Sequence, residues 1–278
     1  MLVAGAGGAR SQASRARTRK GAPDYGGQIL DARTTGYVEA VVERLRVELG
    51  EALAGVYLFG SVALDDYHPP RSDLDIAAVA APTLGPGQAQ RVAARLDHVR
   101  LPCPARRLEL VIYGRERLAA GDVSFELDLN TGPGLQEWRD DARQAPTHWF
   151  VLDVAIGRAH GRTIMGPPPA EVFPDQPSER VVDAIRQSLD WHVEHGVEEG
   201  DAEADAADVV LNACRACRFL EEGTWASKTE AGRWALSRAA PAVVVRQALG
   251  RREAGEGGPP AAAAREFAAE VRRLTAGQ

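Results

Sequence analysis

The chain has 278 residues, 45% of them hydrophobic, which is enough for one large domain or two small ones with buried cores. We expect neither a membrane span nor a secretory signal, because no apolar run is long enough for a bilayer and none follows the basic residues of 1–24. The formal net charge is −6, and outside that segment no basic stripe suggests a nucleic-acid-binding protein. An acidic chain suits a small cationic partner better.

Residues 1–30 mix arginines with Gly, Ala and Ser, so we predict a disordered basic tail there. Cys214-x-x-Cys217 lies in a helical pattern and lacks the two further ligands that a zinc site needs. The chain has three cysteines, and an odd count without a secretory signal is typical of a reducing compartment. We therefore expect a cytoplasmic protein.

Helical and strand patterns alternate in the N-terminal half. Apolar periodicity predicts a helix over 36–53, strands over 56–59 and 76–80, a helix over 88–99, and strands over 108–113 and 125–129. This alternation indicates an α/β domain with a small mixed sheet over residues 31–170.

The pattern changes after the boundary signal Pro167-Pro168-Pro169. Helical patterns then follow one another over 181–195, 204–220, 228–237, 242–252 and 261–274. We expect an all-α helical bundle domain over residues 171–278.

Two short motifs sit at the ends of apolar runs: Gly60-Ser61, and Asp73-Leu74-Asp75 after eleven intervening residues. Residues i and i+2 of a strand point the same way, so Asp73 and Asp75 present two carboxylates together, the oxygen ligands that Mg²⁺ prefers. Gly60 lets backbone approach a phosphate, and Ser61 can donate to a phosphate oxygen. Either motif alone is commonly a solvated turn, but the combination indicates a nucleotidyl-transfer site.

Two further polar residues are candidates for this site. Glu109 enters an apolar strand, where a carboxylate is unfavourable unless it is paired, ligated or facing a cleft. Next to the aspartate strand it would act as general base, third metal ligand or both; the alternative is a solvent-facing glutamate. Lys228 is one of two lysines in an arginine-rich chain and is either a phosphate-binding charge or a surface residue.

Three residues are candidates for contact with an acceptor. Asp205 and Asp208 share a helix face and would either stabilise the helix N-terminus or attract a cation. Trp138 lies among polar residues, where an exposed ring can pack against a sugar or a cation; the alternative is a core tryptophan.

Several motifs together resemble the aminoglycoside adenylyltransferases that modify streptomycin and spectinomycin, within the polymerase-beta-like nucleotidyltransferase superfamily. The resemblance spans about residues 36–240 and rests on Gly60-Ser61, Asp73-Leu74-Asp75, Leu108-Glu109-Leu110-Val111-Ile112, Gly166-Pro167-Pro168 with Phe173, Val209-Val210-Leu211-Asn212-Ala213-Cys214-Arg215, Trp225-Ala226-Ser227-Lys228 and Trp234-Ala235-Leu236. The chain departs from the family at Leu64-Asp65-Asp66, where a glycine is frequent, and in a longer connector between Trp191 and Val209.

The resemblance implies a nucleotidyltransferase α/β domain followed by a helical bundle, with ATP and antibiotic bound between them. It implies that Asp73 and Asp75 bind Mg²⁺, that Glu109 is the catalytic base, that Lys228 binds ATP phosphates, and that Asp205 and Trp138 contact the antibiotic. We also assign Gly60 and Ser61 to the nucleotide site, Glu109 to the metal site as a third ligand, and Asp208 to the acceptor site.

The expected activity is ATP- and Mg²⁺-dependent transfer of AMP to a hydroxyl of an antibiotic such as streptomycin or spectinomycin, with release of pyrophosphate. We expect a monomer that acts on a small cationic acceptor and binds no nucleic acid and no membrane. Two alternatives remain open: the same chemistry on a protein or another small hydroxyl acceptor, or a non-catalytic nucleotide-binding module. Three unpaired acids argue against the second, because a binding module does not need them.

Overall fold

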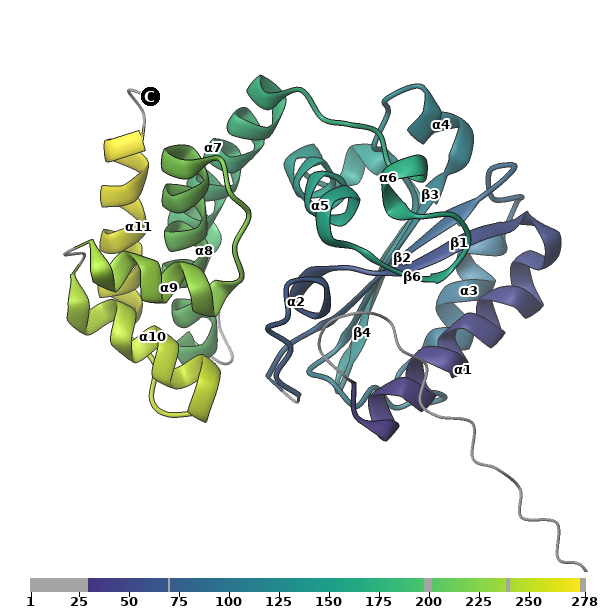
Figure 1. Ribbon diagram of the computed structural model, residues 1–278. Helices are drawn as coiled ribbons and strands as arrows, with labels where there is room; N and C mark the ends of the chain where they lie inside the picture. The colour runs from purple at the N-terminus through teal and green to yellow at the C-terminus, as the bar shows by residue number, and fades with distance from the viewer. Residues whose placement is uncertain (1–29, 70, 198–201, 239–240, 276–278) are drawn as a thin grey trace, which may run out of the picture.

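The computed structural model describes residues 30–69, 71–197, 202–238 and 241–275 (Figure 1). The expected basic tail, apart from residue 30, therefore lies outside the described residues. A sheet with its covering helices forms one part of the molecule, and a bundle of helices lies beside it (Figure 1). No helix in the described ranges is long and apolar enough to cross a membrane.

The N-terminal part is built on one six-stranded mixed sheet in the order β5-β4-β3-β2-β1-β6. Its strands are β1 (Leu53–Leu58), β2 (Leu74–Ala80), β3 (Leu108–Gly114), β4 (Phe125–Gly132), β5 (Leu135–Arg139) and β6 (Arg162–Met165). Among the strands of the described residues, only β2 and β3 pair in parallel, and the other neighbours are antiparallel. The expected small mixed sheet is confirmed.

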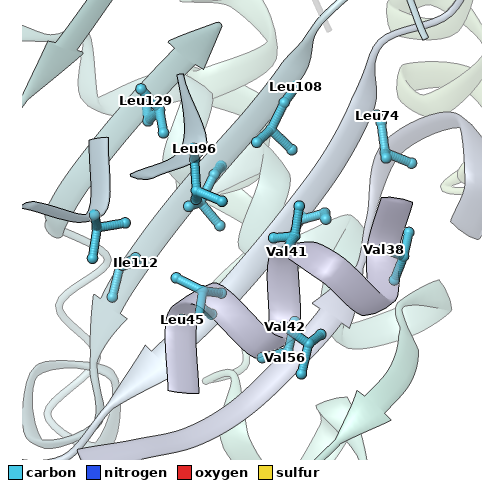
Figure 2. Packing of buried hydrophobic residues seen from close by; sticks show 14 of the residues in the cluster. Val38, Val41, Val42, Leu45, Val56, Leu74, Leu96, Leu108, Ile112 and Leu129 are labelled. Atoms are coloured by element: carbon cyan, nitrogen blue, oxygen red, sulfur yellow. The ribbon is translucent and has the colours of Figure 1, made fainter. Parts of the chain in front are cut away.

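The sheet is covered on both faces. The helices α1 (Ala32–Leu49) and α3 (Gln88–Leu96) share a core with residues of β1 to β4. Figure 2 shows Val38, Val41 and Leu45 of α1 facing this sheet, and all three are fully buried. α5 (Thr147–His160) packs with a second cluster of sheet residues that includes Tyr57 and Tyr113. The short helices are α2 (Gly60–Ala63), α4 (Arg115–Ala119) and α6 (Pro169–Val172), and 3-10 turns span Gly50–Ala52 and Ala142–Gln144.

The C-terminal part is all helical, as expected. It consists of α7 (Ser178–His195), α8 (Ala202–Glu222), α9 (Lys228–Ser237), α10 (Ala242–Ala254) and α11 (Ala261–Thr275). These helices share one apolar core centred on α8, in which Val209, Val210 and Leu211 are fully buried. The division of the chain at residue 170 stays a prediction.

Candidate active site

A cavity of about 730 Å³ lies between the sheet and the helical bundle, and both parts line it. The structure brings most of the candidate residues to this one place: Gly60, Ser61, Asp73, Asp75, Glu109, Asp208 and Lys228 all line the cavity. These residues come from the end of β1, the starts of β2 and β3, and the facing helices α8 and α9.

The Gly60-Ser61 turn is fitted closely to Asp75. Gly60 has a φ of +53°, and a Cβ added there would lie 2.0 Å from Oδ2 of Asp75, so only glycine fits. The backbone N–H of Ser61 hydrogen-bonds to the Asp75 carboxylate. The Ser61 hydroxyl is buried and has no hydrogen-bond partner, which leaves it available to a ligand.

Three carboxylates meet where β2 and β3 begin. Asp75 and Glu109 are direct partners in the parallel pairing of these strands, and Asp73 precedes β2 by one residue. Burial and the negative charge of Asp73 raise the pKa of Asp75, and they raise the pKa of Glu109 well above its ordinary value. Such a cluster needs positive charge beside it to stay ionised.

Two arginines that belong to none of the sequence motifs supply that charge. Arg106 donates Nε–H to Oδ1 and Nη2–H to Oδ2 of Asp73, at 2.8 and 2.6 Å. Arg107 donates to Oε1 of Glu109 at 2.8 Å and lies 3.3 Å from Asp73. Burial raises the pKa of Asp73, but the hydrogen bonds from Arg106 and the charge of Arg107 outweigh it and leave that pKa below its ordinary value.

Within the described residues, no group of three or more His, Cys, Asp or Glu side chains is arranged to hold a metal ion. The predicted ligand set of Asp73, Asp75 and Glu109 is therefore not assembled in this conformation, because Arg106 and Arg107 hold two of its members. Mg²⁺ is usually bound by only one or two carboxylates together with substrate phosphates and water. Asp75, which contacts the Gly60-Ser61 turn, fits that requirement, and Asp73 would join it by exchanging its hydrogen bonds with Arg106 for the metal.

Lys228 is positioned at the cavity by the capped start of α9 and by an ion pair with Asp208. Ser227 caps α9 through a reciprocal capping box with Glu230. The Lys228 ammonium then lies 2.7 Å from Oδ1 of Asp208, and Arg106 lies 3.7 Å from the same carboxylate. Burial opposes ionisation of Asp208, but Lys228 and Arg106 outweigh it and lower its pKa to about 2. Asp208 is thus a partner of the site's cations in this conformation.

A buried cluster ties Lys228 to the N-terminal part. Asp66 accepts hydrogen bonds from the N–H and the hydroxyl of Thr229, at 3.2 and 2.7 Å, and from Nε–H of Arg252 at 3.0 Å. Asp66 and Arg252 are almost fully buried. Asp66 belongs to the segment in which the chain departs from its family resemblance, and its contacts fix the start of α9 against the loop before β2.

The remaining candidate residues lie elsewhere. Trp138 is on the edge strand β5, is 38% exposed and does not line the cavity, although the next residue, Arg139, does. Asp205 falls within α8, but its side chain lies outside the described residues. Arg215, which sequence reasoning used only as part of a motif, lines the cavity and donates Nε–H to the Ala226 carbonyl at 3.0 Å.

Two families match parts of the chain. Residues 38–104 match the nucleotidyltransferase domain, and residues 171–272 match the C-terminal domain of aminoglycoside adenylyltransferase. No significant match exists among curated proteins.

Among solved structures, the spectinomycin adenyltransferase AAD(9) from Enterococcus faecialis, crystallised with ATP and spectinomycin, superposes with a TM-score of 0.67 and 19% identity, covering 87% of this chain and 99% of that one. This match shows a shared fold. A toxin–antitoxin structure with AMP-PNP has 20% identity over 56% of this chain and 90% of that chain, with a TM-score of 0.28, which establishes no common fold.

Proposed function

We propose that this chain, which is an aminoglycoside adenylyltransferase-like nucleotidyltransferase, transfers AMP from ATP to a hydroxyl of a small cationic antibiotic of the aminoglycoside or aminocyclitol class. The observation that supports this best is the convergence of Gly60-Ser61, the two aspartates, Glu109 and Lys228 on one cavity between the two parts of the chain. The shared fold with a protein whose structure holds ATP and spectinomycin supports the same assignment.

The nucleotide would be held at its phosphates. The Ser61 hydroxyl donates to a phosphate oxygen, and the Lys228 ammonium supplies a positive charge from the opposite wall. Asp73 and Asp75 would hold Mg²⁺, which when bound neutralises negative charge on the phosphates. Because Arg106 and Arg107 already hold Asp73 and Glu109, an entering triphosphate would compete with these acids for the two guanidinium groups.

The acceptor hydroxyl would lose its proton to Glu109. A bond then forms between the hydroxyl oxygen and the α-phosphorus, and the bond from that phosphorus to the oxygen bridging to the β-phosphorus breaks. Pyrophosphate leaves with the electron pair of the broken bond. The raised pKa of Glu109 makes it a stronger base than an ordinary carboxylate, and the charge of Arg107 opposes that rise.

Three residues are assigned to the acceptor site, two of them from the family resemblance alone. We assign Asp205 and Trp138 to acceptor contact on that basis, and Asp208 to the electrostatic attraction of a cation as well as to the placement of Lys228. We further propose that the enzyme acts as a cytoplasmic monomer.

The test is pyrophosphate release from ATP and Mg²⁺ over a panel of acceptors that includes spectinomycin and streptomycin. We expect release that depends on an acceptor and is lost in Glu109→Gln, a variant that keeps the shape of the side chain. Binding of ATP without release on any acceptor would contradict the proposal and favour a nucleotide-binding module. Release that depends only on protein from a cell lysate would move the acceptor to a protein side chain.

A further inference from the structure

One acid of the cavity has neither a partner nor a role in the proposed reaction. Asp153 lines the cavity from α5, its side chain is exposed there, and it makes no hydrogen bond or ion pair with any described residue. The other acids are held: Asp66 by Arg252, Asp73 by Arg106, Glu109 by Arg107, Asp128 by Arg139, Asp208 by Lys228, and Asp75 by the N–H of Ser61.

An aromatic wall stands beside this carboxylate. Trp149 precedes Asp153 by four residues on α5, so the two side chains share a helix face, and both line the cavity. The Trp149 ring contacts Trp191 of α7 edge-on, with centroids 5.3 Å apart, and lies 5.6 Å from the ring of His192. α5 and α7 lie side by side (Figure 1), so the wall spans both parts of the molecule.

Asp153 lines the same cavity as Asp75 and Glu109 and interacts electrostatically with both. Its charge contributes to the raised pKa of Glu109, the proposed base, so the two carboxylates are within electrostatic range. Although this side chain is open to the cavity, the protein atoms around it partly desolvate the carboxylate. This desolvation and the charge of Asp75 raise the pKa of Asp153 to about 7, and the charge of Arg215 opposes the rise. An unpaired carboxylate in such surroundings favours a ligand that brings positive charge.

We propose that Asp153 and Trp149 form a subsite that binds a cationic nitrogen group, ammonium or guanidinium, of the acceptor. Asp153 supplies a charge-assisted hydrogen bond, and Trp149 supplies the face of its ring. The inference rests on the proposed function and adds to it the residues that select a charged acceptor. The nucleotide phosphates are excluded as the occupant, because Asp153 would repel them; a contact with ribose hydroxyls is the remaining competitor.

The experiment compares Asp153→Asn with the wild-type enzyme, using streptomycin and spectinomycin as acceptors. Loss of a hydrogen bond to a charged group corresponds to roughly 10- to 100-fold weaker binding, so we expect the acceptor KM to rise by that factor. The dissociation constant of ATP, measured without acceptor, should change less than about twofold. Asp153→Glu should retain part of the affinity, and Trp149→Leu should raise the acceptor KM severalfold.

Asp183→Asn is the matched control, because Asp183 is an exposed acid of α7 that does not line the cavity. An unchanged acceptor KM in Asp153→Asn, with the wild type active, would overturn the subsite alone. A rise in the ATP dissociation constant instead would assign Asp153 to the nucleotide and also overturn it. A wild type that neither binds nor modifies the acceptors would remove the proposed function and the subsite together.

Discussion

The buried pair Asp66–Arg252 should be the most sensitive link between the two parts of the molecule. Arg252→Met removes the guanidinium that lies 2.8 Å from Oδ2 of Asp66 and leaves a nearly buried carboxylate with Thr229 and His68. Removing one partner of a buried ion pair destabilises by about 3–5 kcal/mol. We expect Arg252→Met to lower the free energy of unfolding by about 3 kcal/mol, the lower end of this range, because the hydrogen bonds from Thr229 to Asp66 remain.

The effect should depend on pH with a defined sign. Burial raises the pKa of Asp66, but the charge of Arg252 and the hydrogen bonds from Thr229 outweigh it, so the pKa is lowered in the folded protein. A lowered carboxyl pKa contributes stability above the unfolded value of about 4, and that stability is lost as the pH falls through the folded value. The difference in free energy of unfolding between the wild type and Arg252→Met should therefore be largest near neutral pH and become smaller in acid.

Urea unfolding followed by tryptophan fluorescence and far-ultraviolet circular dichroism measures the free energy of unfolding of both proteins. Arg272→Met is the control, because Arg272 forms an exposed ion pair with Asp190 at 3.3 Å and should change stability by less than about 1 kcal/mol. If Arg252→Met is no less stable than this control, the Asp66–Arg252 pair does not hold the two parts together as described.

Three other substitutions test the metal site, the Gly60 turn and the buried His192. Asp73→Asn should abolish pyrophosphate release while circular dichroism shows an intact fold; retained turnover would remove Asp73 from the reaction. Gly60→Ala should also inactivate, since its Cβ would lie 2.0 Å from Oδ2 of Asp75, and normal activity would show that the turn is not constrained as described. His192 is buried, which lowers its pKa to about 4, so its protonation in the unfolded chain should remove about 3 kcal/mol of stability between pH 6.5 and 4. Urea unfolding of His192→Gln at pH 6.5 and at pH 4 should not show this decrease in the free energy of unfolding. A decrease equal to that of the wild type would contradict the low pKa of His192.

The sequence predicts elements whose own residues determine them. The helix over 228–237 agrees with α9 residue for residue, because Ser227 and Glu230 form a local capping box. The apolar strands over 76–80 and 108–113 likewise lie within β2 and β3. Their parallel pairing places Glu109 beside Asp75, as expected if the two strands are neighbours.

Elements that depend on distant neighbours are not predicted. β5 is mostly exposed at the sheet edge, and β6 has four residues, so neither carries a clear strand pattern. α5 packs against the sheet on one side and α7 on another, which weakens its helical periodicity. The same limit applies to the site: Asp66 meets Arg252 across 186 positions of sequence, and no local pattern announces such a pair.

In the proposed reaction AMP, and not another part of ATP, is transferred to the acceptor. The most direct measurement is mass spectrometry of streptomycin and spectinomycin after incubation with the enzyme, Mg²⁺ and ATP labelled at the α-phosphate. We expect an acceptor heavier by one adenylyl group that carries the label, and no such product with Glu109→Gln. A phosphorylated acceptor without the label, or an unmodified acceptor in the presence of an enzyme that binds both ligands, would contradict it.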